Sequence, residues 1–209
     1  MRSLTAREIS QMSVVSPATR KAFAPSELVI RWAGVLEDPT LRNLPYRIEL
    51  NKWGHIEMTP PASPRHMSIA SSLVRLLEDR LGSKAFTECA IVTSGGLRVA
   101  DVVWCSTAFL ARHVRIWEEW AAAFEEAPEL CIEVMSPSNT YGELQERVQL
   151  YLDAGAQEAW IVHSSGQVDV FGAEASRSVS RLVTDWARWL ATLQSLRGLR
   201  DEGRAGAPP

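Results

Sequence analysis

Membrane and export signals are missing from this 209-residue chain. No stretch approaches the roughly 20 consecutive apolar residues that a membrane-spanning helix needs. The N-terminal sequence MRSLTAREISQMSVVSPATRK contains no apolar run of the signal-peptide kind. The sequence therefore predicts a cytoplasmic protein with no membrane partner.

Cysteine is scarce, and its three residues are widely spaced. Cys89, Cys105 and Cys131 lie far apart, each within an apolar segment, and no CxxC pair occurs. This pattern predicts reduced, buried thiols and gives no sign of a zinc site.

Positive charge is also limited. The net charge is −3 and the pI about 5.9, which argues against a protein that coats nucleic acid through a broad positive field but leaves a local basic groove open. The only lysines are Lys21, Lys52 and Lys84. Any cationic side chain in the second half of the chain must therefore be arginine or histidine.

A nucleophilic serine is not indicated either. The sequence has no G-x-S-x-G elbow, and its four histidines show no spacing that implies a catalytic partner. Ser136 and Ser138 are better explained as residues of a turn and a helix cap.

Hydrophobic periodicity and turn residues predict one mixed α/β domain. Residues 1–24 are expected to be a flexible arm, 25–198 the domain and 199–209 a disordered tail. Ser26 is the expected cap of the first helix, and Trp117 and Trp120 are expected to face the core. The predicted helices are 27–37, 66–81, 107–124, 141–153 and 181–196, and the predicted strands are 46–51, 55–59, 85–93, 97–104, 130–135, 158–163 and 168–171.

Two carboxylates interrupt strands that are otherwise apolar. Glu133 lies within CIEVM and Asp101 within LRVADVVW. A buried carboxylate costs several kcal/mol unless it is paired or holds a metal. Two such strands side by side would present both acids to one Mg²⁺ ion, which often takes only one or two carboxylates with water and phosphate. The alternative is that each acid lies on the solvent face of an edge strand.

The helix predicted after Glu133 carries a candidate cation. Leu144, Val148 and Tyr151 form its apolar stripe, and Arg147 lies about 60° from Leu144 around the helix axis. Arg147 can therefore reach toward the sheet. Glu143, Arg147 and Tyr151 also form one row at a spacing of four, so an exposed salt bridge on the helix is the alternative.

These segments together resemble a known family. The stretches Arg98–Asp101, Glu133–Asn139, Glu146–Tyr151, Ala154–Gly155 and Glu158–Val162 follow the order and spacing of the Uma-type family, restriction-endonuclease-like bacterial proteins of the PD-(D/E)XK nuclease superfamily. Ile48–Leu50, Gly54, Met58 and the segment from Pro61 to His66 are similar to the opening of that family. The resemblance covers roughly residues 45–172.

The resemblance implies a fold and a site. The fold is an α/β (α+β) restriction endonuclease-like domain, a mixed sheet of four or five strands flanked by helices, with an N-terminal β-hairpin extension. Asp101 and Glu133 match the two metal-binding acids for Mg²⁺ or Mn²⁺, and Arg147 falls where the family usually carries lysine. The accessory candidates are Glu49, His66, Glu143 and Tyr151.

Two departures bear on activity. Ala100 replaces the proline that usually precedes the first acid, and Met135 stands where the strand lysine would be. Arg147 stays protonated and cannot act as a general base. We therefore carry two hypotheses: a metal-dependent DNA endonuclease, and a non-catalytic member of the fold that binds nucleic acid or protein. Trp53, at a predicted hairpin tip, is a candidate for base stacking or for a homodimer contact.

Overall fold

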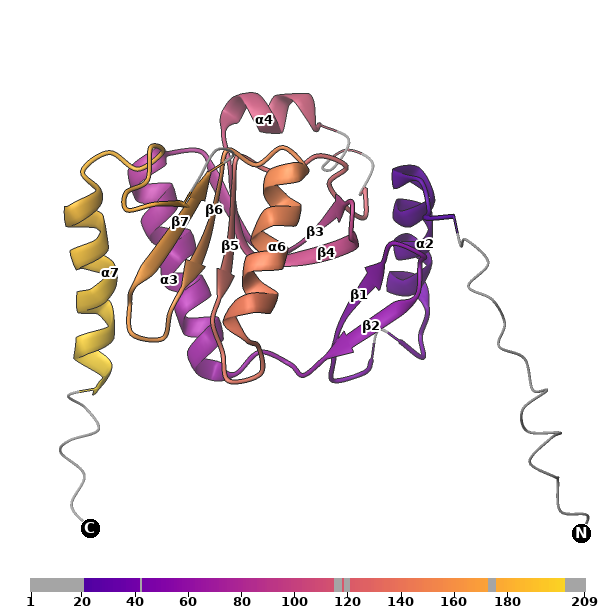
Figure 1. Cartoon of the computed structure of the whole chain (residues 1–209), viewed down its shortest axis with the longest axis horizontal. Coiled ribbons are helices and arrows are strands. Elements are labelled where there is room, and N and C mark those ends of the chain that lie inside the picture. Colours follow the sequence, from indigo (N-terminus) through magenta and orange to yellow (C-terminus); the bar gives the residue numbers. More distant parts are fainter. Residues whose placement is uncertain (1–20, 42, 115–117, 119–120, 173–175, 202–209) are drawn as a thin grey trace, which may run out of the picture.

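The computed structural model describes residues 21–41, 43–114, 118, 121–172 and 176–201. Residues 1–20 of the predicted arm (1–24), Trp117, Trp120 and residues 202–209 of the predicted tail lie outside these residues. The elements of Figure 1 are, in chain order, α2 (Pro25–Glu37), β1 (Arg47–Asn51), β2 (Ile56–Thr59), α3 (Pro64–Leu81), β3 (Lys84–Thr93), β4 (Gly96–Cys105), α4 (Thr107–Arg112), β5 (Leu130–Val134), α6 (Tyr141–Asp153), β6 (Glu158–Val162), β7 (Val168–Gly172), β8 (Ser176–Arg177) and α7 (Trp186–Asp201).

One mixed sheet of eight strands forms the centre of the fold. Its order is β2-β1-β4-β5-β6-β7-β8, and β3 also pairs with β4. The pair β5–β6 is parallel, and α6 makes the crossover that a parallel pair requires. The sheet is larger than the resemblance implied, because the β1–β2 hairpin and the short β8 extend it at its two ends.

β1 and β5 share one edge of β4 and diverge along it. β1 pairs with Gly96 and Leu97 at the start of β4, whereas β5 pairs with Val102–Trp104 near its end. β3 pairs with β4 from end to end, so it takes the opposite edge. The stretch 98–101 therefore borders a fork between β1 and β5, and this fork holds the site.

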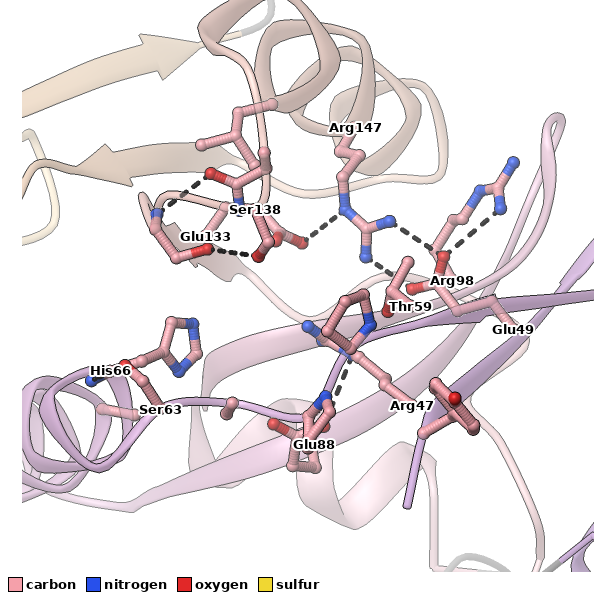
Figure 2. A pocket seen from close by; sticks show the side chains of 18 of the residues that line it. Arg47, Glu49, Thr59, Ser63, His66, Glu88, Arg98, Glu133, Ser138 and Arg147 are labelled. Carbon is pink, nitrogen blue, oxygen red and sulfur yellow. Dashed lines mark hydrogen bonds and ion pairs between the residues drawn. The ribbon is translucent and has the colours of Figure 1, made fainter. Parts of the chain in front are cut away.

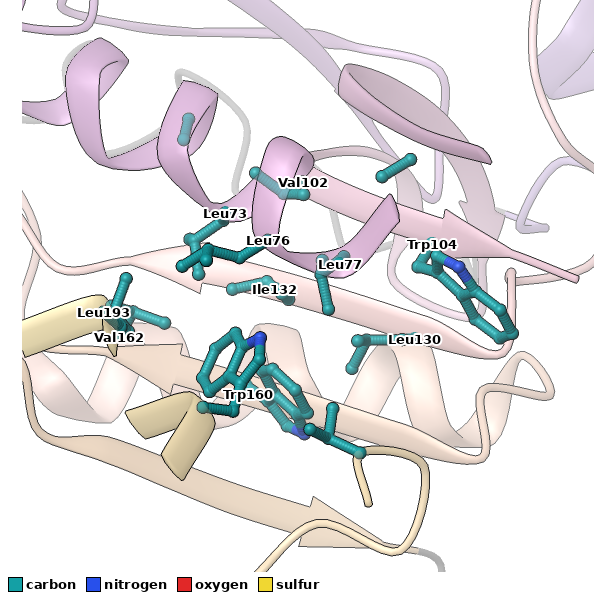
Figure 3. Close-up of a cluster of buried hydrophobic side chains, with 14 of the residues drawn as sticks. Leu73, Leu76, Leu77, Val102, Trp104, Leu130, Ile132, Trp160, Val162 and Leu193 are labelled. Carbon is teal, nitrogen blue, oxygen red and sulfur yellow. The ribbon is translucent and has the colours of Figure 1, made fainter. Parts of the chain in front are cut away.

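Alternation along the strands divides the core between the two faces of the sheet. On one face, α3 and α7 pack over side chains such as Val102, Ile132 and Trp160 (Figure 3). On the other face, α6 packs over Val103 and Ile161. This division explains why the central strands are apolar on both sides, as their sequences indicated.

Most element predictions are confirmed, including the hairpin at Lys52–Gly54 and the helix 141–153. The prediction of one helix over 107–124 is wrong. α4 ends at Arg112, and Phe124 instead joins the edge of β3 through backbone hydrogen bonds to Ala90 and Val92. The apolar side chain of Phe124 is buried by this pairing rather than by a helix face.

The boundaries of the two terminal helices also differ from the prediction. α2 begins at Pro25, and its N-cap is Ala24 rather than Ser26, with the Glu27 carboxylate accepting the Ala24 N–H. α7 begins at Trp186 and ends at Asp201, about five residues later than predicted. The reason is Ser180, whose hydroxyl accepts the N–H groups of Leu182 and Val183 and holds that segment in a turn.

Candidate functional site

The two predicted acids lie opposite each other on neighbouring strands, on the same face of the sheet. In the register of β4 and β5, Val102 is opposite Ile132, which places Asp101 opposite Glu133. Their exposed fractions are 1% and 2%. The alternative that each acid lies on a solvent-facing edge is therefore wrong.

Asp101 accepts three hydrogen bonds. Arg47 Nη1 donates to Oδ1 at 2.7 Å, and Oδ2 lies 2.9 Å from His66 Nε2 and accepts the Val134 N–H at 2.7 Å. Burial raises the pKa of Asp101, but the hydrogen bond from His66 and the charge of Arg47 outweigh it and hold the pKa below its usual range. The same hydrogen bond raises the pKa of His66. Asp101 is therefore an ionised carboxylate with both oxygens engaged.

Glu133 has a different surrounding. Its Oε1 accepts the hydroxyl of Tyr151 at 2.6 Å and lies 3.1 Å from Arg147 Nε, an ion pair without hydrogen-bond geometry. Burial and the negative charge of Asp101 raise the pKa of Glu133, and Arg147 opposes this only in part. The two acids thus have pKa values pushed in opposite directions, which is typical of functional carboxylate pairs.

Glu49 connects β1 to α6. Arg147 donates from Nη1 and Nη2 to the two Glu49 oxygens at 2.8 Å and 2.5 Å, and the Val99 N–H donates to Oε1 at 2.8 Å. Burial raises the pKa of Glu49, but the hydrogen bonds and the charge of Arg147 outweigh it and lower the pKa. The helical salt bridge with Glu143 is therefore not the role of Arg147, which turns toward the sheet as the helical wheel predicted.

At the fork, side chains form the hydrogen bonds that the backbone of Val99 on β4 would otherwise make with a neighbouring strand. The carbonyl of Val99 accepts from Arg147 Nη2 at 3.0 Å and also from Arg47 Nη2. Together with Glu49 on the Val99 N–H, these contacts replace the strand partner that this residue lacks on the fork side. The arginines are consequently fixed by the sheet as well as by the acids.

A cavity of about 1160 Å³ opens over this cluster (Figure 2). Glu133 and Arg147 line it from one side, and Arg47 and His66 from the other, while Asp101 lies beneath Arg47 and His66. The loop 136–139 and the start of α3 form its rim. Charged groups are thus buried at the base of an open pocket, an arrangement typical of active sites.

The structure brings most of the predicted site residues together. Asp101, Glu133, Arg147, Glu49, His66 and Tyr151 form one connected cluster. Glu143 differs, since its carboxylate accepts from the N–H and hydroxyl of Thr140 at the start of α6, and these bonds lower its pKa. Glu143 therefore has a helix-capping role at the rim of the pocket.

Sequence reasoning missed Arg98, whose Nη1 donates to Glu49 Oε2 at 3.3 Å, and two further members of the cluster. Arg47 lies on the same face of β1 as Glu49, so strand alternation contained a signal for it. Glu88 lies on β3 with φ +54°, and its Oε2 is 3.5 Å from Arg47 Nε. A left-handed glutamate within a strand has no sequence signature that would have revealed it.

The donor chemistry of the acid pair suits a hard divalent cation, and the pair already holds a cationic group. Arg47 forms an ion pair with Asp101, and its positive charge also acts to lower the pKa of Glu133. Within the described ranges, no three His, Cys, Asp or Glu side chains are gathered to hold a metal ion. A bound Mg²⁺ would therefore use the two carboxylates with water or substrate oxygens, which is its usual manner of binding.

Comparison with known proteins identifies the family. The profile of the Uma2 family, described as "Putative restriction endonuclease", matches residues 36–200. A search of curated proteins finds no match. A solved structure from Anabaena variabilis ATCC 29413, described as "a putative nuclease belonging to DUF820", aligns with a TM-score of 0.56 and 20% identity over 74% of this chain and 94% of that chain.

The solved structure supports the restriction endonuclease-like fold, and the family match covers most of the chain, including both acids and Arg147. No helix in the described segments is long and apolar enough to cross a membrane. The chain is a member of the Uma2 family, the group described as "Putative restriction endonuclease".

Proposed function

We propose that this protein is a metal-dependent nuclease that hydrolyses phosphodiester bonds of DNA, with Asp101 and Glu133 as ligands of Mg²⁺ or Mn²⁺. One observation carries the proposal. Two buried acids lie opposite each other on neighbouring strands; Glu133 lines a pocket together with Arg147, and Asp101 lies behind Arg47 and His66, which line the same pocket. Family membership supports the same reaction class.

When bound, the divalent cation would supply Lewis acidity toward a phosphate and lower the pKa of a coordinated water. The chain's own residues would hold the ligands in place. His66 and the Val134 N–H fix the carboxylate of Asp101, and Tyr151 fixes that of Glu133. Such fixed orientation is what a catalytic carboxylate pair requires.

Arg147 would act as a fixed positive charge. It remains protonated at every accessible pH, so it cannot accept the proton of the attacking water. Its contacts with Glu49 and Glu133 fix the guanidinium at the pocket, where it would stabilise the negative charge that develops on a bound phosphate. We therefore propose that Arg147 replaces the charge of the usual lysine, but not a proton-accepting role.

A second candidate function is binding without hydrolysis. The observation that favours it is the charge balance of the cluster, in which Arg47, Arg98 and Arg147 already neutralise Asp101, Glu49 and Glu133 without a metal ion. Such a pocket would hold a nucleic acid or a protein partner through the same arginines. A homodimer remains a prediction of the sequence.

The test is cleavage of supercoiled plasmid, single-stranded DNA and RNA by wild-type protein and by Asp101→Asn, each with Mg²⁺, Mn²⁺ or EDTA. The proposal expects cleavage by the wild type that EDTA stops and the variant lacks. Equal residual cleavage by wild type and variant would show a contaminant and contradict the proposal. Binding of DNA without cleavage would favour the second candidate.

A further inference from the structure

Arg47 binds one of the two acids that the proposed function assigns to the metal ion. Its Nη1 donates to Asp101 Oδ1 at 2.7 Å, and its Nη2 donates to the Val99 carbonyl. The other Asp101 oxygen is occupied by His66 and by a backbone N–H of β5. Three of the roughly four lone-pair positions of this carboxylate are thus taken, and a divalent cation that approaches Oδ1 meets the permanent positive charge of Arg47 there.

Among these donors, Arg47 has an alternative partner. The Val134 N–H belongs to the sheet and cannot move away without breaking β5. Arg47 is a long side chain that lines the pocket, and its buried Nε has no hydrogen-bond partner. The carboxylate of Glu88 already forms an ion pair with that nitrogen, with Oε2 at 3.5 Å.

Glu88 is held in an unusual conformation beside Arg47. It has φ +54°, a region that glutamate rarely adopts. In the β3–β4 ladder it is opposite Asp101, between the pairs Thr87–Val102 and Cys89–Ala100. Its side chain is 52% exposed, so it can receive a guanidinium at the pocket wall. Strained backbone of this kind is concentrated at functional sites.

We propose that Arg47 is a built-in competitor of the metal ion: it pairs with both Asp101 and Glu88 in the unloaded site, and it releases Asp101 and keeps Glu88 when a divalent cation binds. The inference rests on the proposed function, since it concerns the same acid pair. Its consequence is that Arg47 sets the metal affinity of the site. Removal of Arg47 should tighten metal binding, whereas removal of Glu88 should weaken it.

The test is calorimetric titration of the full chain with Mn²⁺, which requires no activity. Arg47→Gln should bind Mn²⁺ at least about tenfold more tightly than wild type, or about 1.4 kcal/mol. Arg98→Gln is the matched control, because Arg98 lines the same pocket but pairs with Glu49 and Glu57. It should change the affinity less than about threefold, the residual effect of one lost charge.

A second variant should change the Mn²⁺ affinity in the opposite direction. Glu88→Gln should weaken Mn²⁺ binding about threefold or more, because the displaced guanidinium loses its second partner. Glu57→Gln is its control, since Glu57 is similarly exposed and pairs with Arg98 instead. Glu88 is at the surface, so this pair of variants decides the matter even if Arg47→Gln does not fold.

The outcomes separate this inference from the proposed function. Wild-type binding with no gain for Arg47→Gln over Arg98→Gln, or no loss for Glu88→Gln relative to Glu57→Gln, overturns the competition and leaves the metal site intact. Absence of Mn²⁺ binding by both wild type and Arg47→Gln overturns the competition and the metal site together.

Discussion

Two buried glutamates on neighbouring parallel strands serve different purposes in this molecule. Glu133 on β5 and Glu158 on β6 are 2% and 1% exposed. Glu158 accepts from the indole of Trp160, the hydroxyl of Ser180 and the N–H of Arg181, which fastens the segment before α7 to the sheet. Glu133 lines an open pocket and faces a second acid and an arginine.

The comparison teaches that burial of an acid does not by itself mark a site. Glu158 has its hydrogen bonds satisfied by mostly neutral donors within a packed region, so its carboxylate is structural. Glu133 lies beside Asp101, whose negative charge is balanced by Arg47 and His66. These side chains could give way to a ligand. Access and the kind of partner, rather than burial, separate the two acids.

The largest expected difference between them is in catalysis. Glu133→Gln should reduce the rate of DNA cleavage about 10³-fold, a loss of about 4 kcal/mol of transition-state stabilisation, because it removes one of two metal ligands. Glu158→Gln should leave the rate per folded molecule within about twofold. Initial rates on plasmid DNA, normalised to folded protein, provide the measurement. Equal loss in both variants would contradict the distinction.

Stability should show the reverse order. Glu158→Ala should lower the free energy of unfolding by about 3 kcal/mol, because it leaves the Trp160 indole and the Arg181 N–H without their acceptor. Urea denaturation followed by tryptophan fluorescence measures this loss. Glu158→Gln is the control, since its amide oxygen still accepts, and it should lose roughly half as much. A loss below about 0.5 kcal/mol for the alanine variant would show that the hydrogen bonds of Glu158 contribute little to stability.

A smaller effect is expected at the hydroxyl that holds Glu133. Tyr151→Phe removes a 2.6 Å hydrogen bond and keeps the buried ring. We expect about a tenfold loss of cleavage rate, or about 1.4 kcal/mol, because the carboxylate is less firmly oriented. Tyr141→Phe is the matched control, since its hydroxyl donates to Asp169 instead. A rate equal to that of wild type would remove Tyr151 from the site.

The smallest effect concerns acid stability. The pKa of Glu49 is lower in the folded protein than its usual value of 4.5. Between these two pKa values the unfolded chain binds more protons than the folded protein. The stability that Glu49 contributes is therefore present above its usual pKa and lost as the pH falls through the folded pKa. The free energy of unfolding of wild type should fall more steeply below that pKa than that of Glu49→Gln. Parallel curves would contradict this assignment.

Strand and helix patterns indicated four residues of this site, whereas Glu49 and His66 followed only from the family resemblance. Acids within apolar strands indicated Asp101 and Glu133, and helical periodicity placed Arg147 and Tyr151 toward the sheet. Arg47 could have been found from its alternation with Glu49, but its contact with Asp101 joins residues 54 positions apart in the sequence. Such contacts depend on how β1 and β5 diverge from β4, which no local pattern encodes.

Other features could not be predicted, because tertiary contacts override local preference. The sequence up to Phe124 has a helical pattern, yet the backbone of Phe124 pairs with β3 and its side chain enters the core. Glu88 adopts a left-handed conformation that strand alternation would not suggest. The start of α7 depends on Glu158, which accepts the hydroxyl of Ser180 and the N–H of Arg181 from a distant strand.

The most direct test of the central claim is calorimetric titration of Mn²⁺ into three proteins: wild type, Asp101→Asn and Glu158→Gln. If the acid pair on β4 and β5 is the cation site, Asp101→Asn loses the heat of binding, and Glu158→Gln binds with wild-type affinity. Undiminished heat from Asp101→Asn, or no heat from the wild type, would contradict the assignment of the site.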